Sequence, residues 1–257
     1  MIPDNKVFLI TGASSGIGKE IAKLLSKENC SLALIARRGD LLNSLAEQLK
    51  PNKAIIETYV CDVSNINDVH TVICNVRASF GRIDVVILNA GVGYKSVVPN
   101  YESEKAKETF DVNVFGITNF VEFVLPDFIK RKQGMIVGVS SLADSRGWKG
   151  SGFYCASKAA ATILLENLRV ELKPFNINVI TVKPGFVDTP MTAKNKFPMP
   201  FLMSAEKAAK IIIKGMKKEN KVIQFPFPMV VSSKLMRIVP DFLFEYISIK
   251  KPSKIKD

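Results

Sequence analysis

Tyr154 and Lys158 stand four residues apart in the segment GFYCASKAA (152–160), which otherwise consists mostly of small residues. This spacing places two side chains on the same face of a helix. A lysine ammonium beside a phenol favours the phenolate and lowers the phenol pKa from its usual value of about 10. A phenol tuned in this way can exchange protons near neutral pH. Taken alone, such a pair more often marks a buried tyrosine beside a surface lysine, so its meaning depends on the rest of the chain.

Short β-branched runs alternate with longer amphipathic stretches along the sequence. Strands are predicted at 6–11, 31–36, 54–60, 84–88, 134–140, 177–182 and 221–225, and helices at 16–28, 39–50, 65–80, 102–131, 153–173 and 204–218. This alternation predicts a parallel sheet with helices on both faces, and near-continuous apolar strands fit burial on both sides. We expect a single doubly wound α/β domain of Rossmann type over residues 1–257. Its sheet would have about seven strands, mostly or wholly parallel, and a hydrophobic, basic extension would follow at about 226–257.

Composition and charge exclude several classes of protein. The formal net charge is +12, and residues 207–257 alone hold twelve Lys or Arg and four Asp or Glu. The excess is therefore a basic C-terminal surface, and no nucleic-acid partner is expected. Four scattered cysteines and the single histidine, His70, predict neither a disulfide framework nor a metal site. The apolar run that begins within the first residues leaves no room for a secretion signal, so we expect a cytoplasmic protein.

A glycine-rich turn follows the first predicted strand. Gly12, Gly16 and Gly18 lie in TGASSGIG, directly before a helix. Glycines at this place allow a tight turn and bring the backbone close to a pyrophosphate at the helix N-terminus, although the spacing differs from the commoner G-x-G-x-x-G. After the second strand, Arg37 and Arg38 stand where an NAD site usually carries an acid, and guanidinium donors suit a 2′-phosphate. We therefore expect NADP(H), with NAD(H) less favoured.

Seven short motifs follow one another within residues 5–225. They are TGASSGIG (11–18), CDV (61–63), LNAG (88–91), NVFG (113–116), VSS (139–141), YCASK (154–158) and PGFVDTP (184–190). In this order they resemble the short-chain dehydrogenase/reductase family, in its short single-domain branch. The resemblance implies an NAD(P)-dependent oxidoreductase. Two departures concern the coenzyme end: Leu88 replaces a frequent asparagine, and the glycine turn lacks the basic residue of some NADP-dependent members.

The resemblance also implies a coenzyme site. Asp62 would contact the adenine, Asn89 would brace the sheet beside the coenzyme, and Thr189 would hold the nicotinamide carboxamide. The predicted cofactor-binding residues are Gly12, Ser14, Ser15, Gly16, Ile17, Gly18, Arg37, Arg38, Asp62, Val63, Asn89, Ala90, Gly91, Tyr154, Lys158, Pro184, Gly185, Val187 and Thr189.

The catalytic residues that the resemblance implies are Asn113, Ser141, Tyr154 and Lys158. Ser141 is preferred to Ser140 because it precedes Tyr154 by thirteen residues, the usual offset in the family. Tyr154 would give a proton in reduction and take one in oxidation. Lys158, together with the positive charge of the oxidised nicotinamide, would lower the pKa of Tyr154, and Lys158 would also bind the nicotinamide ribose. Ser141 would hold the substrate oxygen as charge develops there. The Asn113 amide would hold a water that relays protons to Lys158.

Substrate-pocket residues in this family follow the catalytic serine and the PG motif. Here they are Leu142, Trp148, Phe186 and Met191, with FPMPFLM (197–203) beyond them. These apolar and flexible side chains predict a small hydrophobic carbonyl or alcohol substrate. An alternative is that some of them only close the core beneath a lid.

The C-terminal extension allows more than one interpretation. Leu235, Ile238 and Val239 form an apolar stripe, which Pro240 interrupts before DFLFEYISI and a basic end. The pattern fits a peripheral amphipathic helix on an anionic membrane, a helix over the substrate mouth, or a subunit contact. The resemblance itself implies a homodimer or homotetramer formed through helices 102–131 and 153–173.

Other functions remain open to a chain of this kind. One is a catalytically silent NADP-binding regulatory protein, since a fold does not fix a function; four intact catalytic residues favour an enzyme. An NAD-dependent alcohol dehydrogenase of the same family is a second alternative. A dehydratase or epimerase is disfavoured because only about 70 residues follow Pro184, too few for the longer substrate domain of those relatives.

Overall fold

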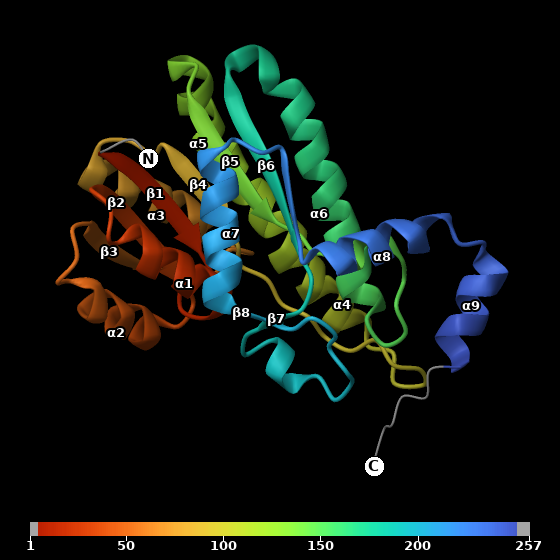
Figure 1. The fold of residues 1–257 in the computed structure, drawn as a ribbon. Coiled ribbons are helices and arrows are strands. Elements are labelled where there is room, and N and C mark those ends of the chain that lie inside the picture. The colour runs from red at the N-terminus through yellow and green to blue at the C-terminus, as the bar shows by residue number, and fades with distance from the viewer. Residues whose placement is uncertain (1–4, 251–257) are drawn as a thin grey trace.

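A parallel sheet of seven strands runs through the centre of the computed structural model, which describes residues 5–250 (Figure 1). The strand order is β3-β2-β1-β4-β5-β6-β9, and every adjacent pair is parallel. The strands are β1 (Lys6–Thr11), β2 (Cys30–Ala36), β3 (Ile55–Val60), β4 (Val85–Leu88), β5 (Gly134–Val139), β6 (Ile177–Pro184) and β9 (Val222–Phe225). The predicted doubly wound Rossmann-type fold is confirmed.

Helices cover both faces of the sheet and bury two apolar cores. Helices α1 (Gly16–Leu25), α2 (Gly39–Leu49) and α7 (Ala205–Lys217) contribute to the first core, and α3 (Ile66–Phe80), α5 (Gly116–Arg131) and α6 (Gly152–Glu171) to the second. Strand β1 serves both cores, because successive side chains point to opposite faces. Phe8 and Ile10 enter the first core and Val7 and Leu9 the second. This alternation explains why the central strands are apolar at nearly every position.

The long helix predicted at 102–131 is built from three pieces. Helix α4 (Ser103–Phe110) continues through a π-helical segment (Asp111–Phe115) into α5. By length and composition this continuous helix could cross a membrane, but half of its apolar stretch is buried inside the fold, with Phe120 and Phe128 fully enclosed in the second core. We therefore interpret it as a core helix. The π-helical segment re-aims the side chains at its centre, which include Asn113.

The chain beyond β6 adds elements that the sequence pattern did not separate. Two short paired strands, β7 (Val187–Asp188) and β8 (Met203–Ser204), enclose the segment that follows β6. After β9 come α8 (Phe227–Ile238) and α9 (Asp241–Lys250), which part at Pro240. Helix α9 stands away from the sheet and reaches the body through α8 and the loop after β5 (Figure 1).

Candidate active site

The glycine turn between β1 and α1 is a cradle that side chains would fill. Gly12 and Gly16 have φ of +66° and +57°, which other residues rarely adopt. A Cβ on Gly12 would lie 2.9 Å from the Ala90 Cα, and one on Gly18 would lie 2.5 Å from the Gly12 carbonyl oxygen. The bare backbone at the N-terminus of α1 therefore fits the pyrophosphate of a dinucleotide.

Hydrogen bonds tie the LNAG segment after β4 to this turn. The Asn89 amide donates to the backbone carbonyls of Thr11 (3.0 Å) and Gly12 (3.3 Å). The Thr11 hydroxyl accepts the backbone N–H groups of Asn89 (2.9 Å) and Ala90 (3.0 Å). Sequence reasoning anticipated the bracing by Asn89 but missed Thr11, which the first letter of TGASSGIG could have signalled.

The two arginines after β2 have different partners. Arg38 donates to the hydroxyls of Ser14 (3.1 Å) and Ser15 (2.9 Å), so its guanidinium lies over the glycine turn. Arg37 instead faces Asp62, with its nitrogen 3.6 Å from a carboxylate oxygen. Burial acts to raise the Asp62 pKa, but hydrogen bonds from Ser64 and the nearby Arg37 charge hold it below its ordinary value. Asp62 is therefore a carboxylate at neutral pH.

Tyr154 and Lys158 meet on one face of α6, as the spacing predicted. The Lys158 ammonium is 5.8 Å from the centroid of the Tyr154 ring and donates to the Val139 carbonyl (2.8 Å). Burial lowers the pKa of Lys158 to about 8. Burial also raises the pKa of Tyr154, and a hydrogen bond with Ser141 only partly offsets this. Burial therefore outweighs the neighbouring groups of the protein itself, and the lowering of the phenol pKa expected from Lys158 together with the positive charge of the oxidised nicotinamide stays a prediction.

The two serines after β5 separate into different environments. Ser141 is placed beside the Tyr154 phenol and its hydroxyl also contacts the Pro184 carbonyl at 3.5 Å. The Ser140 hydroxyl points into α6, where it donates to the Lys158 carbonyl (2.8 Å) and pairs with Thr162 (2.7 Å). This geometry favours Ser141 as the serine that faces a substrate.

Asn113 is buried at the centre of the π-helical segment and is held on three sides. Its Oδ1 accepts the Val92 N–H (2.8 Å), and its Nδ2 donates to the Val92 carbonyl and the Ser157 hydroxyl (2.9 Å each). Both amide hydrogens are thus used by the protein. The side chain thus fastens α6 to the residue that follows the LNAG segment, and a water held by this amide would use the remaining lone pair of Oδ1.

The PGFVDTP segment brings the far end of the sequence against the glycine turn. Thr189 lies so close that a Cβ on Gly16 would be 3.0 Å from its Cγ2. The Thr192 hydroxyl fixes this segment by accepting the Thr189 N–H (3.0 Å) and donating to the Val187 carbonyl (2.6 Å). Thr192 carried no motif signal. The remaining predicted coenzyme residues lie nearby in the chain: Ile17 is in the first turn of α1, Val63 follows Asp62, Gly91 ends the LNAG segment, and Pro184 and Gly185 stand at the end of β6 and directly after it.

The predicted substrate-pocket residues are spread over the segments that follow Ser141 and Pro184. Leu142 is buried, and its carbonyl accepts the Ser233 hydroxyl of α8 (3.3 Å). Trp148 makes an edge contact with Phe244 of α9, at 5.5 Å between ring centroids. Phe186 contacts Phe197 at 5.9 Å. The side chain of Met191 is exposed. The C-terminal helices thus contribute to this region, which the sequence allowed but did not decide.

A buried ion pair, which the sequence did not reveal, lies next to the segments that hold Ser141 and Pro184. The Lys183 ammonium is 2.6 Å from Asp144 Oδ2, which also accepts the Thr162 hydroxyl (2.7 Å). Arg237 of α8 approaches the other carboxylate oxygen at 3.6 Å. Asp144 lies in the 3-10 turn that begins after Ser141, and Lys183 directly precedes Pro184. The pair therefore joins the two strand ends that carry the candidate site.

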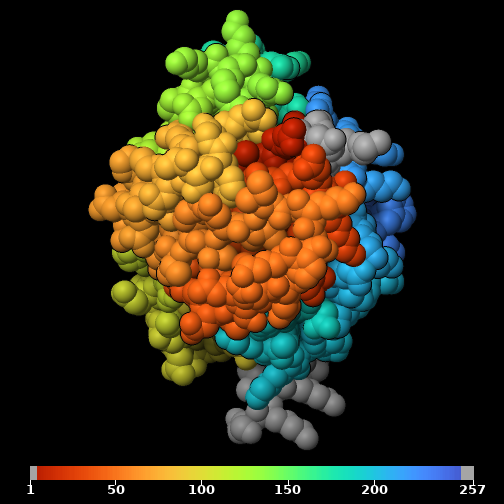
Figure 2. All heavy atoms as spheres, turned by 90° about the vertical axis from the view of Figure 1, so that its left-hand side faces the viewer, coloured from red at the N-terminus to blue at the C-terminus, as the bar shows by residue number. Residues whose placement is uncertain are grey.

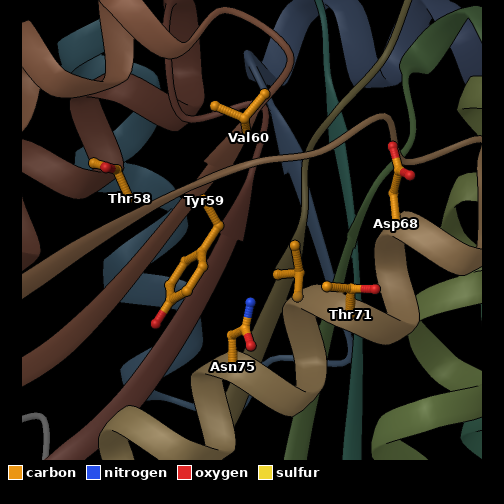
Figure 3. A pocket seen from close by; sticks show the side chains of 7 residues that line it. Thr58, Tyr59, Val60, Asp68, Thr71 and Asn75 are labelled. Atoms are coloured by element: carbon orange, nitrogen blue, oxygen red, sulfur yellow. The ribbon is translucent and has the colours of Figure 1, made fainter.

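A separate cavity lies at the β3 edge of the sheet, which three strands separate from β5. Its lining comes from β3 and α3, with Tyr59 and Asn75 among the side chains that face it (Figure 3). Figure 2 views the molecule from this edge, where the orange segments of the first third of the chain form most of the face. No candidate catalytic residue lines this cavity, so we do not assign it to the reaction.

Comparison with known proteins agrees with this geometry. The model of the short chain dehydrogenase family matches residues 6–198, and the chain belongs to that family of oxidoreductases. It is 35% identical to an uncharacterized oxidoreductase of Myxococcus xanthus, with 92% of this chain and 94% of that protein covered.

Two solved structures illustrate the fold and its ligands. A short-chain dehydrogenase from Burkholderia phymatum in complex with NAD has a TM-score of 0.82 at 22% identity and covers 90% of this chain and 92% of its own. An alcohol dehydrogenase from the archaeon Thermococcus sibiricus, complexed with 5-hydroxy-NADP, has a TM-score of 0.78 at 28% identity, with 86% and 95% covered. Both of these proteins were solved with a nicotinamide coenzyme or a derivative of one.

Proposed function

We propose that this protein is an NADP(H)-dependent oxidoreductase that interconverts a carbonyl and a secondary alcohol on a hydrophobic substrate. The observation that carries the proposal is the convergence of Asn113, Ser141, Tyr154 and Lys158 around the segment that follows β4. A Cβ on Gly91 would lie 3.2 Å from Asn113 Oδ1 and 3.5 Å from the Lys158 ammonium. The four converging residues come from three different parts of the chain and meet at the carboxyl ends of the central strands, where doubly wound sheets bind ligands.

The preference for NADP(H) rests on Arg38. Its guanidinium already lies on the Ser14 and Ser15 hydroxyls, at the place where a 2′-phosphate beside the glycine turn would sit. Arg37 is partly neutralised by Asp62. We therefore assign the larger share of phosphate binding to Arg38 and the adenine side to Asp62 and Val63.

The protein's own groups divide the remaining work. NADP(H), when bound, supplies or accepts the hydride. The Tyr154 hydroxyl gives its proton to the substrate oxygen in reduction and takes one back in oxidation, and the Ser141 hydroxyl holds that oxygen. Lys158 and the nicotinamide charge would then stabilise the phenolate that remains.

Turnover and coenzyme binding can be separated with Tyr154→Phe. Purified wild type and variant are titrated with NADPH by fluorescence and then assayed with a panel of hydrophobic ketones. We expect equal NADPH binding and a loss of turnover of about 10²–10⁴-fold in the variant, the contribution of a positioned acid. NADPH binding without turnover of any ketone by the wild type would instead favour the silent regulatory alternative.

The coenzyme assignment is tested with Arg38→Ala, and Arg37→Ala serves as its matched control. We expect Arg38→Ala to weaken the binding of NADPH by about tenfold or more, because charge-assisted contacts to the 2′-phosphate are lost. The binding of NADH should change little. Arg37→Ala should change the NADPH-to-NADH ratio less. A wild type that prefers NADH would contradict the assignment and favour the NAD-dependent alternative.

The remaining parts of the proposal concern assembly and location. Phe115, Ile163 and Val170 are large apolar side chains that stay exposed on the π-helical segment and α6, which supports a homodimer or homotetramer through these helices. We propose a cytoplasmic enzyme, consistent with its four unpaired cysteines.

A further inference from the structure

Helices α8 and α9 expose a large apolar surface that no described part of the chain covers. Phe227, Ile238, Phe242 and Ile249 are 78%, 78%, 75% and 73% exposed. A typical soluble monomer rarely leaves a contiguous group of this kind facing water. The exposed apolar residues of the two helices are Phe227, Val231, Leu235 and Ile238 on α8, and Phe242, Leu243, Tyr246 and Ile249 on α9.

Each helix gathers these residues into a stripe. On α8 they recur at intervals of four, four and three residues from Phe227 to Ile238. On α9, Phe242, Tyr246 and Ile249 follow at intervals of four and three, and Leu243 borders the same face. Such spacing places them on one helix face. The opposite face of α8 is occupied: a Cβ on Gly185 would be 2.6 Å from the Met229 sulfur, and Ser233 donates to the Leu142 carbonyl. The face of α8 that holds Met229 and Ser233 therefore packs on the candidate site, whereas the apolar stripe on the opposite face has no partner among the described residues.

Basic charge accompanies the stripes. Lys234 is exposed on α8 within the same arc as Phe227 and Ile238. On α9, Asp241 is held by Arg146 at 3.0 Å, which leaves Glu245 as the other acid of that helix. The sequence then ends in residues 250–257, which contain four lysines and one aspartate. An apolar helix face that carries Lys234, in a chain whose next segment in sequence is rich in lysine, complements a bilayer with anionic headgroups.

We propose that α8 and α9 dock this protein on the surface of an anionic lipid bilayer. A second copy of the chain fits less well, because a two-fold contact sets each surface against itself and would oppose Lys234 with a like charge. Neither helix is long enough to span a membrane: α8 has 12 residues and α9 has 10. The contact is therefore a peripheral one.

Docking would also bring the substrate region to the lipid. Helix α8 touches the segments that follow Ser141 and Pro184, and the apolar side chains of Phe197, Phe201 and Leu202 are exposed beyond β7. Both β7 and α9 lie at the end of the molecule where the strands finish (Figure 1). This consequence rests on the proposed function, since it requires a hydrophobic substrate that partitions into the bilayer.

The experiment is vesicle flotation of the full chain with NADPH present. Vesicles of phosphatidylcholine alone are compared with vesicles of phosphatidylcholine and phosphatidylserine. We expect the wild type to float with the anionic vesicles, and Phe242→Ser/Ile249→Ser to bind them at least about tenfold more weakly, because two large apolar side chains leave the contact. Lys234→Glu should weaken binding to the vesicles that contain phosphatidylserine and leave any binding to phosphatidylcholine vesicles unchanged. The matched control is Ile55→Ser/Val60→Ser, a pair that is 65% and 66% exposed on β3 and should bind as the wild type does.

Two further readouts keep the outcomes distinct. Trp148 is the only tryptophan of the chain and contacts Phe244 of α9, so its emission should shift when anionic vesicles are added. Sedimentation velocity is measured in parallel. A wild type that stays in solution with both vesicles would overturn the proposal, and so would a smaller assembly in the α9 variant without any vesicle binding, which would identify a second copy as the occupant. NADPH titration and ketone turnover without lipid are scored separately, so failure of docking leaves the proposed reaction standing.

Discussion

The buried pair of Asp144 and Lys183 offers a quantitative test of how the candidate site is held together. The side chains are 0% and 8% exposed, and their charged atoms lie 2.6 Å apart. They connect the turn after Ser141 to the end of β6. We consider Asp144→Leu, Lys183→Met and the double variant.

The structure predicts that the two single substitutions lower the free energy of unfolding by different amounts. Removal of one partner from a buried ion pair costs about 3–5 kcal/mol. Asp144→Leu leaves the Lys183 ammonium without its carboxylate and should fall at the upper end of that range. Lys183→Met leaves Asp144 with the Thr162 hydroxyl at 2.7 Å and the Arg237 guanidinium at 3.6 Å, so its cost should fall at the lower end. The double variant leaves no unpaired charge of this pair and should be at least about 2 kcal/mol more stable than Asp144→Leu.

Guanidinium unfolding at a fixed chain concentration measures these values, because the stability of an oligomer depends on concentration. In thermal scans, a loss of about 4 kcal/mol corresponds to roughly 8–16 °C for a chain of this size. A loss of unfolding free energy below about 1 kcal/mol in Asp144→Leu would show that the pair does not stabilise the fold. A double variant whose loss equals the sum of the two single losses would show that the two side chains do not interact.

Two other predictions concern the glycine turn and the catalytic lysine. In Gly18→Ala the new Cβ would lie 2.5 Å from the Gly12 carbonyl oxygen, so NADPH binding should weaken by about tenfold or more in a fluorescence titration. Gly147→Ala, whose Cβ would meet nothing within 4 Å, is the control, and equal binding by both variants would count against the cradle. Burial lowers the pKa of Lys158 from 10.5 to about 8, so between these values the unfolded chain binds more protons at this group and stability rises with pH. Lys158→Met should lack this part of the rise when unfolding midpoints near pH 8 and pH 10 are compared; an unchanged difference between the two pH values would show that Lys158 is charged throughout.

The order and type of the main elements could be predicted from the sequence because their signals are local. The runs at 6–11 and 134–140 are apolar enough to be buried on both faces, and β1 and β5 occupy those positions to within one residue. The elements after β6 were harder to predict from the sequence. Strands β7 and β8 have two residues each, too few for a periodic pattern. The C-terminal helices carry a clear stripe, but a stripe shows only that one face is apolar, and not what covers it.

The sequence by itself determined the fold class, the family and the identity of the residues with chemistry to offer, because these depend on residue types and on spacing within single elements. Tertiary structure decided how those residues act on one another. It placed Arg38 rather than Arg37 on the glycine turn, and it turned Ser140 toward α6 and Ser141 toward Tyr154. It also enclosed Tyr154 and Lys158 so that burial governs the pKa of both groups. Charge effects and desolvation depend on neighbours brought in from distant parts of the chain, so no motif can report them.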